Sequence, residues 1–211
     1  MTLPAQRIER SYARLNDVRT QMGDAAPLLA TQYHAVRFYE NDRSLAQIVA
    51  KFLSDGFAAG NPGIVVATPA HRGAILRELV AKSLDVVQLQ RSHDLVLLDA
   101  QETLSLFMAN GKPQGEAFTN SMCEVIKTAC GGRPNCTVRI YGQMVDLLWK
   151  DGQQEAAIRL ETLWNQLATT QAFSLLCGYA MGPFYKDANF QEVCRHHTHV
   201  VSADGEMSAV A

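Results

Sequence analysis

Short runs of aliphatic and aromatic residues alternate with longer helical patterns from residue 34 onward. Apolar runs of strand length without polar alternation are typical of parallel strands that are buried on both faces. They predict five strands, at residues 35–39, 64–67, 95–99, 138–141 and 173–177. Apolar positions at helical spacing predict the helices between and around them, at residues 45–53, 75–80, 104–108, 118–129 and 156–167. This order predicts an α/β three-layer sandwich, with a mostly parallel sheet of five or more strands between two layers of helices.

The first thirty residues follow a different pattern. Apolar residues recur there at steps of three and four among charged residues: Ile8, Tyr12, Leu15, Val18 and Met22. We therefore expect an amphipathic helix and linker at residues 1–30, a single α/β domain at residues 31–203 and a flexible tail at residues 204–211. The helix is expected to pack on its own domain, and a homodimer or partner contact through residues 1–30 is the alternative.

Charge and composition exclude several classes of protein. The 211 residues carry 19 basic and 21 acidic side chains, a net charge of -2, without the concentrated basic face of a nucleic-acid binder. No apolar run approaches the roughly 20 residues of a membrane helix, and residues 1–30 lack a signal-peptide core. The five cysteines include no C-x-x-C pair, so we expect neither a disulfide framework nor a structural zinc site. Reduced thiols in the cytoplasm fit this composition best.

The junction after the first strand is unsuited to phosphate binding. Residues 39–44 (YENDRS) contain no glycine and no Gly-Lys-Ser/Thr, so a Walker A loop is absent and ATP is not expected as a cofactor. Asn41 or Asp42 is expected to cap the following helix. Asp99 ends a strand as a Walker B carboxylate would, but without a phosphate loop it is expected to make local hydrogen bonds. Hydrolase and metalloprotease motifs are also missing, so we do not expect an enzyme.

A cluster of unusual side chains lies near the C-terminus. Cys194, His196, His197 and His199 fall within six residues, and the Cys-x-x-His spacing would place a thiolate and an imidazole on one helical face, which suits a soft metal. The alternative is that these side chains make structural hydrogen bonds at a helix end. The sequence leaves Cys194, His197 and His199 as weak metal candidates, and we expect no metal.

Six segments, in order and at matching spacing, carry a family resemblance. They are residues 34–40 (HAVRFYE), 52–71, 141–149 (YGQMVDLLW), 160–165 (LETLWN), 173–177 (FSLLC) and 194–200 (CRHHTHV). Together they resemble the MEDS domain, a sensory domain of methanogen and methylotroph regulators that includes the dichloromethane-responsive repressor. The resemblance extends over about residues 33–201, nearly the whole α/β region.

The resemblance implies a RecA/KaiC-like fold that has lost its phosphate loop. It also implies a non-catalytic sensor of a small organic ligand, coupled to an output partner such as a histidine kinase or transcriptional regulator. This chain has Gln143 where the family commonly has glutamate, so a role as metal ligand or general base is in doubt at that position. We expect signalling through a separate protein, without direct contact to nucleic acid or membrane. The alternatives are an interaction module of a kinase or anti-sigma pathway, and a metal-binding protein that uses the C-terminal cluster.

The expected positions of residues at the ends of the parallel strands select candidate ligand-binding residues. In open parallel sheets, ligands bind beyond the carboxyl ends of the strands. Seven candidates follow strand ends: Tyr39, Glu40, Thr68, Asp99, Tyr141, Gln143 and Tyr179. Trp149 and Trp164 could wall a pocket there, or belong to the core. His34 and His71 complete the set, and each has a structural role as its alternative.

Overall fold

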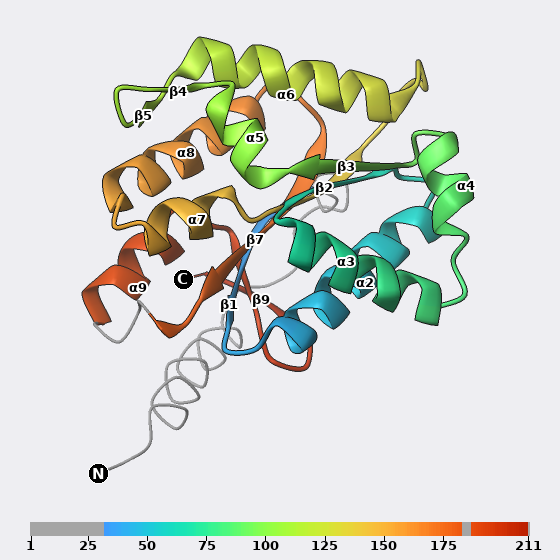
Figure 1. Ribbon diagram of the computed structural model, residues 1–211, viewed down its shortest axis with the longest axis horizontal. Coiled ribbons are helices and arrows are strands. Elements are labelled where there is room, and N and C mark those ends of the chain that lie inside the picture. The colour runs from blue at the N-terminus through green and yellow to red at the C-terminus, as the bar shows by residue number, and fades with distance from the viewer. Residues whose placement is uncertain (1–31, 183–186, 211) are drawn as a thin grey trace, which may run out of the picture.

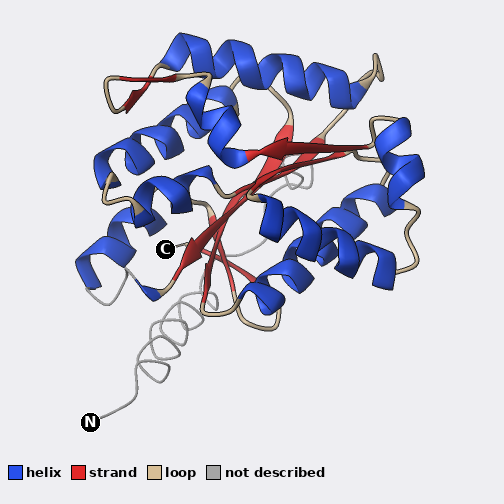
Figure 2. Cartoon of the chain, viewed as in Figure 1, coloured by secondary structure: helices blue, strands red, loops and turns tan. Residues whose placement is uncertain are grey.

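A seven-stranded sheet forms the centre of the protein (Figures 1 and 2). The computed structural model describes residues 32–182 and 187–210, so the helix expected at residues 1–30 lies outside the described residues. The strand order is β3-β2-β6-β7-β1-β8-β9, and every pairing is parallel except that of β8 with β9. The strands are β1 (His34–Tyr39), β2 (Gly63–Ala67), β3 (Leu95–Asp99), β6 (Val138–Gly142), β7 (Phe173–Ala180), β8 (His199–Val201) and β9 (Met207–Ala209).

Helices cover both faces of this sheet, as the alternating pattern predicts (Figure 2). One face packs against α2 (Asp42–Ala58) and α3 (Pro69–Ala81), with α4 (Val86–Arg91) beside them. The other face carries α5 (Ala100–Ser105), α6 (Gly115–Cys130), α7 (Met144–Lys150), α8 (Gln154–Leu167) and α9 (Asp187–Cys194). Among the described residues, no helix has the length and hydropathy to cross a bilayer.

The five strands predicted from the sequence are all present, and polar side chains start the helices that follow them. The Asn41 side chain accepts a hydrogen bond from the Ser44 amide at the start of α2, and Thr68 accepts one from the His71 amide at the start of α3. Asp99 accepts bonds from the first amides of α5. Each cap satisfies backbone donors that a helix start would otherwise leave unpaired. The local role predicted for Asp99 is therefore confirmed.

Several short elements differ from the expectation. The helix expected at residues 104–108 ends at Ser105, and β4 (Met108–Ala109) forms a hairpin with β5 (Lys112–Pro113). Asn110 and Gly111 both have positive φ, 52° and 71°, as the tight turn of a hairpin requires. Helices α4, α7 and α9 are too short to give a clear periodic signal. Within the segment expected as a flexible tail, Met207–Ala209 pairs with β8 as the last strand of the sheet.

The expectation of five reduced thiols is wrong for one pair of cysteines. Cys130, at the end of α6, forms a disulfide with Cys136, six residues later in the loop before β6. Gly131 and Gly132 between them have positive φ, which lets the chain reverse closely enough to bring the two sulfurs together. Cys123, Cys177 and Cys194 are free thiols. This spacing has no C-x-x-C signature, so the sequence offered no motif for the pair.

Candidate functional site

The carboxyl ends of β1, β6 and β7 meet in a buried polar network. The Tyr39 hydroxyl, at the end of β1, donates to Asp146 Oδ2 over 2.8 Å. Lys150, one turn along α7 from Asp146, donates to the same oxygen at 2.7 Å and lies 3.3 Å from the Tyr39 hydroxyl. Asp146 Oδ1 accepts the backbone amide of Ala180 at the end of β7. Asp146, only 1% exposed, thus joins α7 to two strands of the sheet.

Three further predicted residues border this network. Gln143 Oε1 accepts the Thr68 amide at 2.9 Å, which ties the end of β6 to the start of α3. His71 Nε2 lies 3.1 Å from Asp42 Oδ1, and the His71 ring packs edge-on against the Tyr39 ring. Gln143 therefore acts as a neutral acceptor of a backbone hydrogen bond, the capacity expected for glutamine at this position.

The Tyr141 hydroxyl is fully buried beside this network. It has no hydrogen-bond partner within the described residues, whereas most buried hydroxyls are paired. Burial is the main cause that raises the pKa of Tyr141, and nearby Tyr39 and Asp146 raise it further. Burial and then Asp146 likewise raise the pKa of Tyr39. Both phenols stay protonated at neutral pH and can donate hydrogen bonds.

The remaining candidates from the sequence lie elsewhere. Glu40 is exposed, and Asp99 pairs with Arg72 at 3.2 Å. Trp164 packs edge-on between Phe118 and Phe173 in the core, which is the alternative stated for it. Tyr179 points to the other face of the sheet.

A cavity of about 500 Å³ opens on the α7–α8–α9 side of the molecule. Trp149, which packs against Tyr179 in the core, forms part of its wall. The rest of the lining comes from α8 and α9: Gln154, Glu155, Ile158, Arg159, Thr162 and Glu192. Trp149 is therefore both a core residue and a pocket residue, the two roles left open by the sequence.

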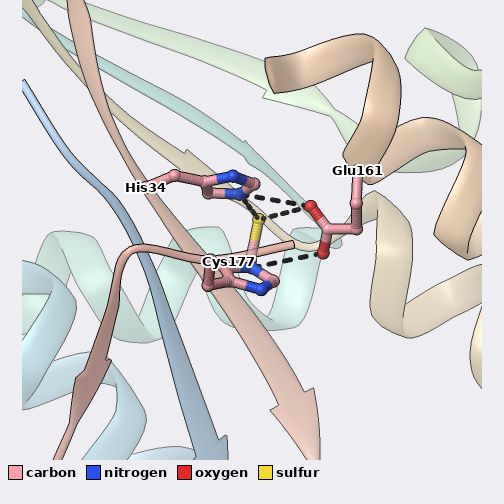
Figure 3. Close-up of side chains that lie close together, drawn as sticks. His34, Glu161 and Cys177 are labelled. Atoms are coloured by element: carbon pink, nitrogen blue, oxygen red, sulfur yellow. Dashed lines mark hydrogen bonds and ion pairs between the residues drawn. The ribbon is translucent and has the colours of Figure 1, made fainter. Parts of the chain in front are cut away.

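A second polar cluster lies under α8, on the opposite face of the sheet from Tyr39. His34, at the start of β1, Cys177 on β7 and Glu161 on α8 point toward one another (Figure 3). His197, just before β8, completes the group, and all four residues are buried. Alternation along the strands explains the placement, since His34 and Cys177 face the α8 side while Tyr39 faces α2 and α3.

The potential ligand atoms of this cluster lie close together. His34 Nε2 is 3.2 Å from Glu161 Oε2 and 3.4 Å from Cys177 Sγ. Cys177 Sγ is 3.6 Å from the same carboxylate oxygen, and His197 Nε2 is 3.4 Å from Glu161 Oε1. One ligand atom from each residue can be chosen so that all four lie within 4.8 Å of one another. Such a set of nitrogen, oxygen and sulfur donors is able to hold a metal ion.

Partners outside the cluster orient its side chains. His34 Nδ1 contacts Asn165 Oδ1 at 2.9 Å, and the Asn165 amide nitrogen donates to the His196 carbonyl. His197 Nδ1 contacts the Val193 carbonyl at 2.8 Å. Tyr179 donates to Glu161 Oε1 at 2.7 Å.

Burial and neighbouring charges shift the pKa values in this cluster. Burial opposes ionisation of Glu161, but the His197 and His34 rings and the Tyr179 hydroxyl outweigh it and lower the pKa of Glu161 to about 2. Burial, followed by nearby His34, lowers the pKa of His197 to about 3. Burial and then Glu161 raise the pKa values of the Cys177 thiol and the Tyr179 phenol well above their usual ranges.

Sequence reasoning found only part of each cluster. Of the C-terminal metal candidates, His197 joins the buried group, whereas Cys194 and His199 are not among its four members. Glu161 and Cys177 lie in segments that carry the family resemblance, but nothing in their spacing connects them with His34. Asp146 and Lys150 were also missed, because α7 was not predicted. The available signal for these two residues was a carboxylate and a lysine spaced four residues apart, shortly after the end of a predicted strand.

Comparison with known proteins agrees with this architecture. A KaiC-like protein from the hyperthermophilic archaeon Pyrococcus horikoshii OT3 has a similar structure, with a TM-score of 0.53 and 14% sequence identity over 80% of this chain and 70% of that chain. This likeness shows the RecA-like fold. No curated protein matches the chain. The family model of the methanogen/methylotroph, DcmR sensory domain (MEDS) matches residues 33–198, which include strands β1, β2, β3, β6 and β7 of the sheet and both polar clusters. The chain therefore belongs to the MEDS family of sensory domains.

Proposed function

We propose that this chain is a non-catalytic sensor that binds a small organic molecule at the carboxyl ends of β1, β6 and β7. The signal passes to a separate output protein, a histidine kinase or a transcriptional regulator. Membership in a family of sensory domains supports the sensory role. The observation that carries the choice of site is the buried Asp146 carboxylate held by Tyr39 and Lys150, with the unpartnered Tyr141 hydroxyl beside it.

The position of this network in the fold supports binding there. Ligands of open parallel α/β sheets bind beyond the carboxyl ends of the strands, and the network lies at that edge. Lys150 is 41% exposed while Asp146 is 1% exposed, so the network extends from solvent into the interior. A small molecule with hydrogen-bonding groups can therefore reach Asp146 by displacing the lysine side chain.

The same contacts offer a way to transmit binding. Asp146 links α7 to β1 through Tyr39 and to β7 through the Ala180 amide. A ligand that competes for the Asp146 carboxylate alters these links, and α7 then shifts relative to the sheet. Because Trp149 of α7 lines the cavity beside α8 and α9, the change reaches a surface that an output protein can contact. A ligand shifts such an equilibrium only by its difference in affinity for the two positions of α7.

Ligand screening on the full chain tests the proposal. We expect some members of a library of small polar organic molecules to raise the melting temperature and to shift amide signals at the ends of β1, β6 and β7. Asp146→Asn keeps the size and accepting oxygen of the side chain but removes its charge, and should weaken the same ligands at least tenfold. Asp151→Asn, an exposed change at the end of α7, is the matched control. Hits with unchanged affinity for Asp146→Asn, or no hits with folded protein, would overturn the proposal.

A further inference from the structure

We propose that His34, Glu161, Cys177 and His197 form a four-ligand zinc site. This site is separate from the strand-end network and goes beyond the proposed ligand sensing. Two imidazole nitrogens, one thiolate and one carboxylate form a borderline-soft donor set, which favours Zn²⁺ over the oxygen-seeking Mg²⁺ and Ca²⁺. The expectation from the sequence was that no metal binds, so this proposal and that expectation make opposite predictions.

The spacing of the donor atoms fits tetrahedral coordination. Zinc lies about 2.0 to 2.1 Å from nitrogen or oxygen ligands and about 2.3 Å from sulfur, so neighbouring ligand atoms in a tetrahedron are roughly 3.3 to 3.6 Å apart. His34 Nε2 is 3.2 Å from the Glu161 oxygen and 3.4 Å from the Cys177 sulfur. The sulfur is 3.6 Å from the same oxygen. Small adjustments of buried side chains can bring all four donors onto one ion.

In both histidines of the cluster, Nδ1 makes a hydrogen bond outside the cluster, which leaves Nε2 available as the metal ligand. His197 Nδ1 lies against the Val193 carbonyl, so this nitrogen carries the proton and donates. In the neutral ring, Nε2 then presents a lone pair toward Glu161 Oε1 at 3.4 Å, and it has no hydrogen-bond partner within the described residues. A lone pair facing a carboxylate oxygen is unfavourable without a cation between them. The buried Nε2 of His197 is thus an independent sign that an ion belongs in the cluster.

His34 has the corresponding arrangement. Asn165 donates its amide nitrogen to the His196 carbonyl, which directs Oδ1 toward His34 Nδ1. His34 Nδ1 therefore donates to Asn165, and its Nε2 faces Cys177 and Glu161. Histidines that bind metals usually donate their second ring nitrogen to a carbonyl or carboxylate in this way. Both rings are oriented as zinc ligands, one by a side-chain amide and one by the backbone.

Charge also favours a divalent ion. With Cys177 as thiolate and Glu161 as carboxylate, the four ligands carry two negative charges, and Zn²⁺ would make the buried group neutral. All four residues are buried, and burial of uncompensated charge is costly. Four protein ligands leave no open position, which is typical of a structural zinc site and not of a catalytic one. The ion would join α8 to β1, β7 and the start of β8.

Metal titration of the full chain tests this proposal. Purified protein is stripped with a chelator under reducing conditions, and Zn²⁺ is added in competition with a chromophoric chelator. We expect one zinc per chain and an increased melting temperature, because an ion that binds only the folded state stabilises it. Co²⁺ serves as the spectroscopic probe, with the strong visible bands of tetrahedral coordination and a near-ultraviolet thiolate-to-cobalt band. Substoichiometric zinc, or cobalt spectra typical of six oxygen ligands, would overturn the proposal.

Variants distinguish this site from adventitious binding. Cys177→Ser should remove the thiolate-to-cobalt band, whereas Cys194→Ser, which changes a free thiol outside the cluster, should retain it. Asn165→Ala should weaken zinc by about 10- to 100-fold, the usual effect of losing a partner that orients a ligand. Asn165 is exposed, so this variant should fold even if Cys177→Ser does not. Unchanged zinc affinity in Asn165→Ala, or loss of the cobalt band in Cys194→Ser, would count against the site.

Discussion

The Tyr179 hydroxyl donates a 2.7 Å hydrogen bond to Glu161 Oε1, and both residues are fully buried. This bond connects β7 in the sheet with α8 above it. Its acceptor is a carboxylate without access to water, so the bond stabilises a charge in addition to joining two elements. Hydrogen bonds to charged groups are stronger than those between neutral groups.

Replacing Tyr179 by phenylalanine should therefore destabilise the metal-free protein markedly. We expect a loss of about 1.5 to 3 kcal/mol in the free energy of unfolding, the range for hydrogen bonds to charged groups. Denaturant unfolding measures this change. Tyr141→Phe is the matched control, because the Tyr141 hydroxyl is equally buried but has no partner within the described residues. Equal losses of unfolding free energy in the two variants would contradict a stabilising role for the hydrogen bond from Tyr179 to Glu161.

The pH dependence of stability should differ between the wild type and Tyr141→Phe. Burial raises the pKa of Tyr141 well above the ordinary tyrosine value of 10.0, so above pH 10.0 the phenol ionises in the unfolded chain but not in the folded protein. The contribution of Tyr141 to the free energy of unfolding is fully present below pH 10.0, and it falls as the pH rises toward the pKa of Tyr141 in the folded protein. Relative to the wild type, Tyr141→Phe should gain about 1.4 kcal/mol between pH 8 and about pH 11. Parallel pH profiles for the two proteins would contradict this prediction.

A side chain larger than hydrogen at Gly178 on β7 should clash with Tyr141 and destabilise the protein. A Cβ at position 178 would lie 2.9 Å from the Tyr141 hydroxyl oxygen, on the neighbouring strand. Gly178→Ala is therefore expected to cost about 1 to 3 kcal/mol, the usual range for overpacking. The double variant with Tyr141→Phe should recover part of this loss, because it removes the atom that clashes. Additive losses in chemical denaturation would show that the strain lies elsewhere.

Asp99 should behave as a structural residue. Asp99→Ala removes the cap of α5 and the ion pair with Arg72, and we expect a loss of about 0.5 to 2 kcal/mol in unfolding free energy. Asp99→Asn retains the capping oxygen and should lose less. Affinity for ligands found by screening should be unchanged in Asp99→Asn. A large loss of ligand affinity in that variant would place Asp99 in the binding site after all.

The fold was predictable from the sequence because buried parallel strands leave continuous apolar runs. The Ile64 to Ala67 run is an example, since both faces of β2 are covered and no polar alternation interrupts it. Short elements were less predictable: α7 has seven residues, too few to show a helical period. The β4–β5 hairpin had a local signal in Asn110-Gly111, a dipeptide typical of tight hairpin turns.

The sites were harder to predict than the fold, because they depend on contacts between distant residues. The rule that ligands bind beyond the carboxyl ends of parallel strands predicted that Tyr39, Thr68 and Gln143 lie at one edge of the sheet. His71 lies near them because it is in the first turn of the adjoining helix α3. The buried cluster combines positions 34, 161, 177 and 197, which no sequence spacing connects. Only the register of β1 with β7 and the position of α8 above them bring these side chains together.

Strand β1 has six residues, and its two ends belong to the two polar clusters. His34 begins the strand on the α8 side, and Tyr39 ends it on the α2 side, roughly 17 Å away at the usual rise per residue. One interior strand of the sheet is thus shared by the proposed zinc site and the proposed ligand site. If occupancy of one site alters affinity at the other, thermodynamic linkage requires the reverse effect to have the same magnitude. Zinc affinity, measured with and without a ligand, would then report sensing without any knowledge of the output partner.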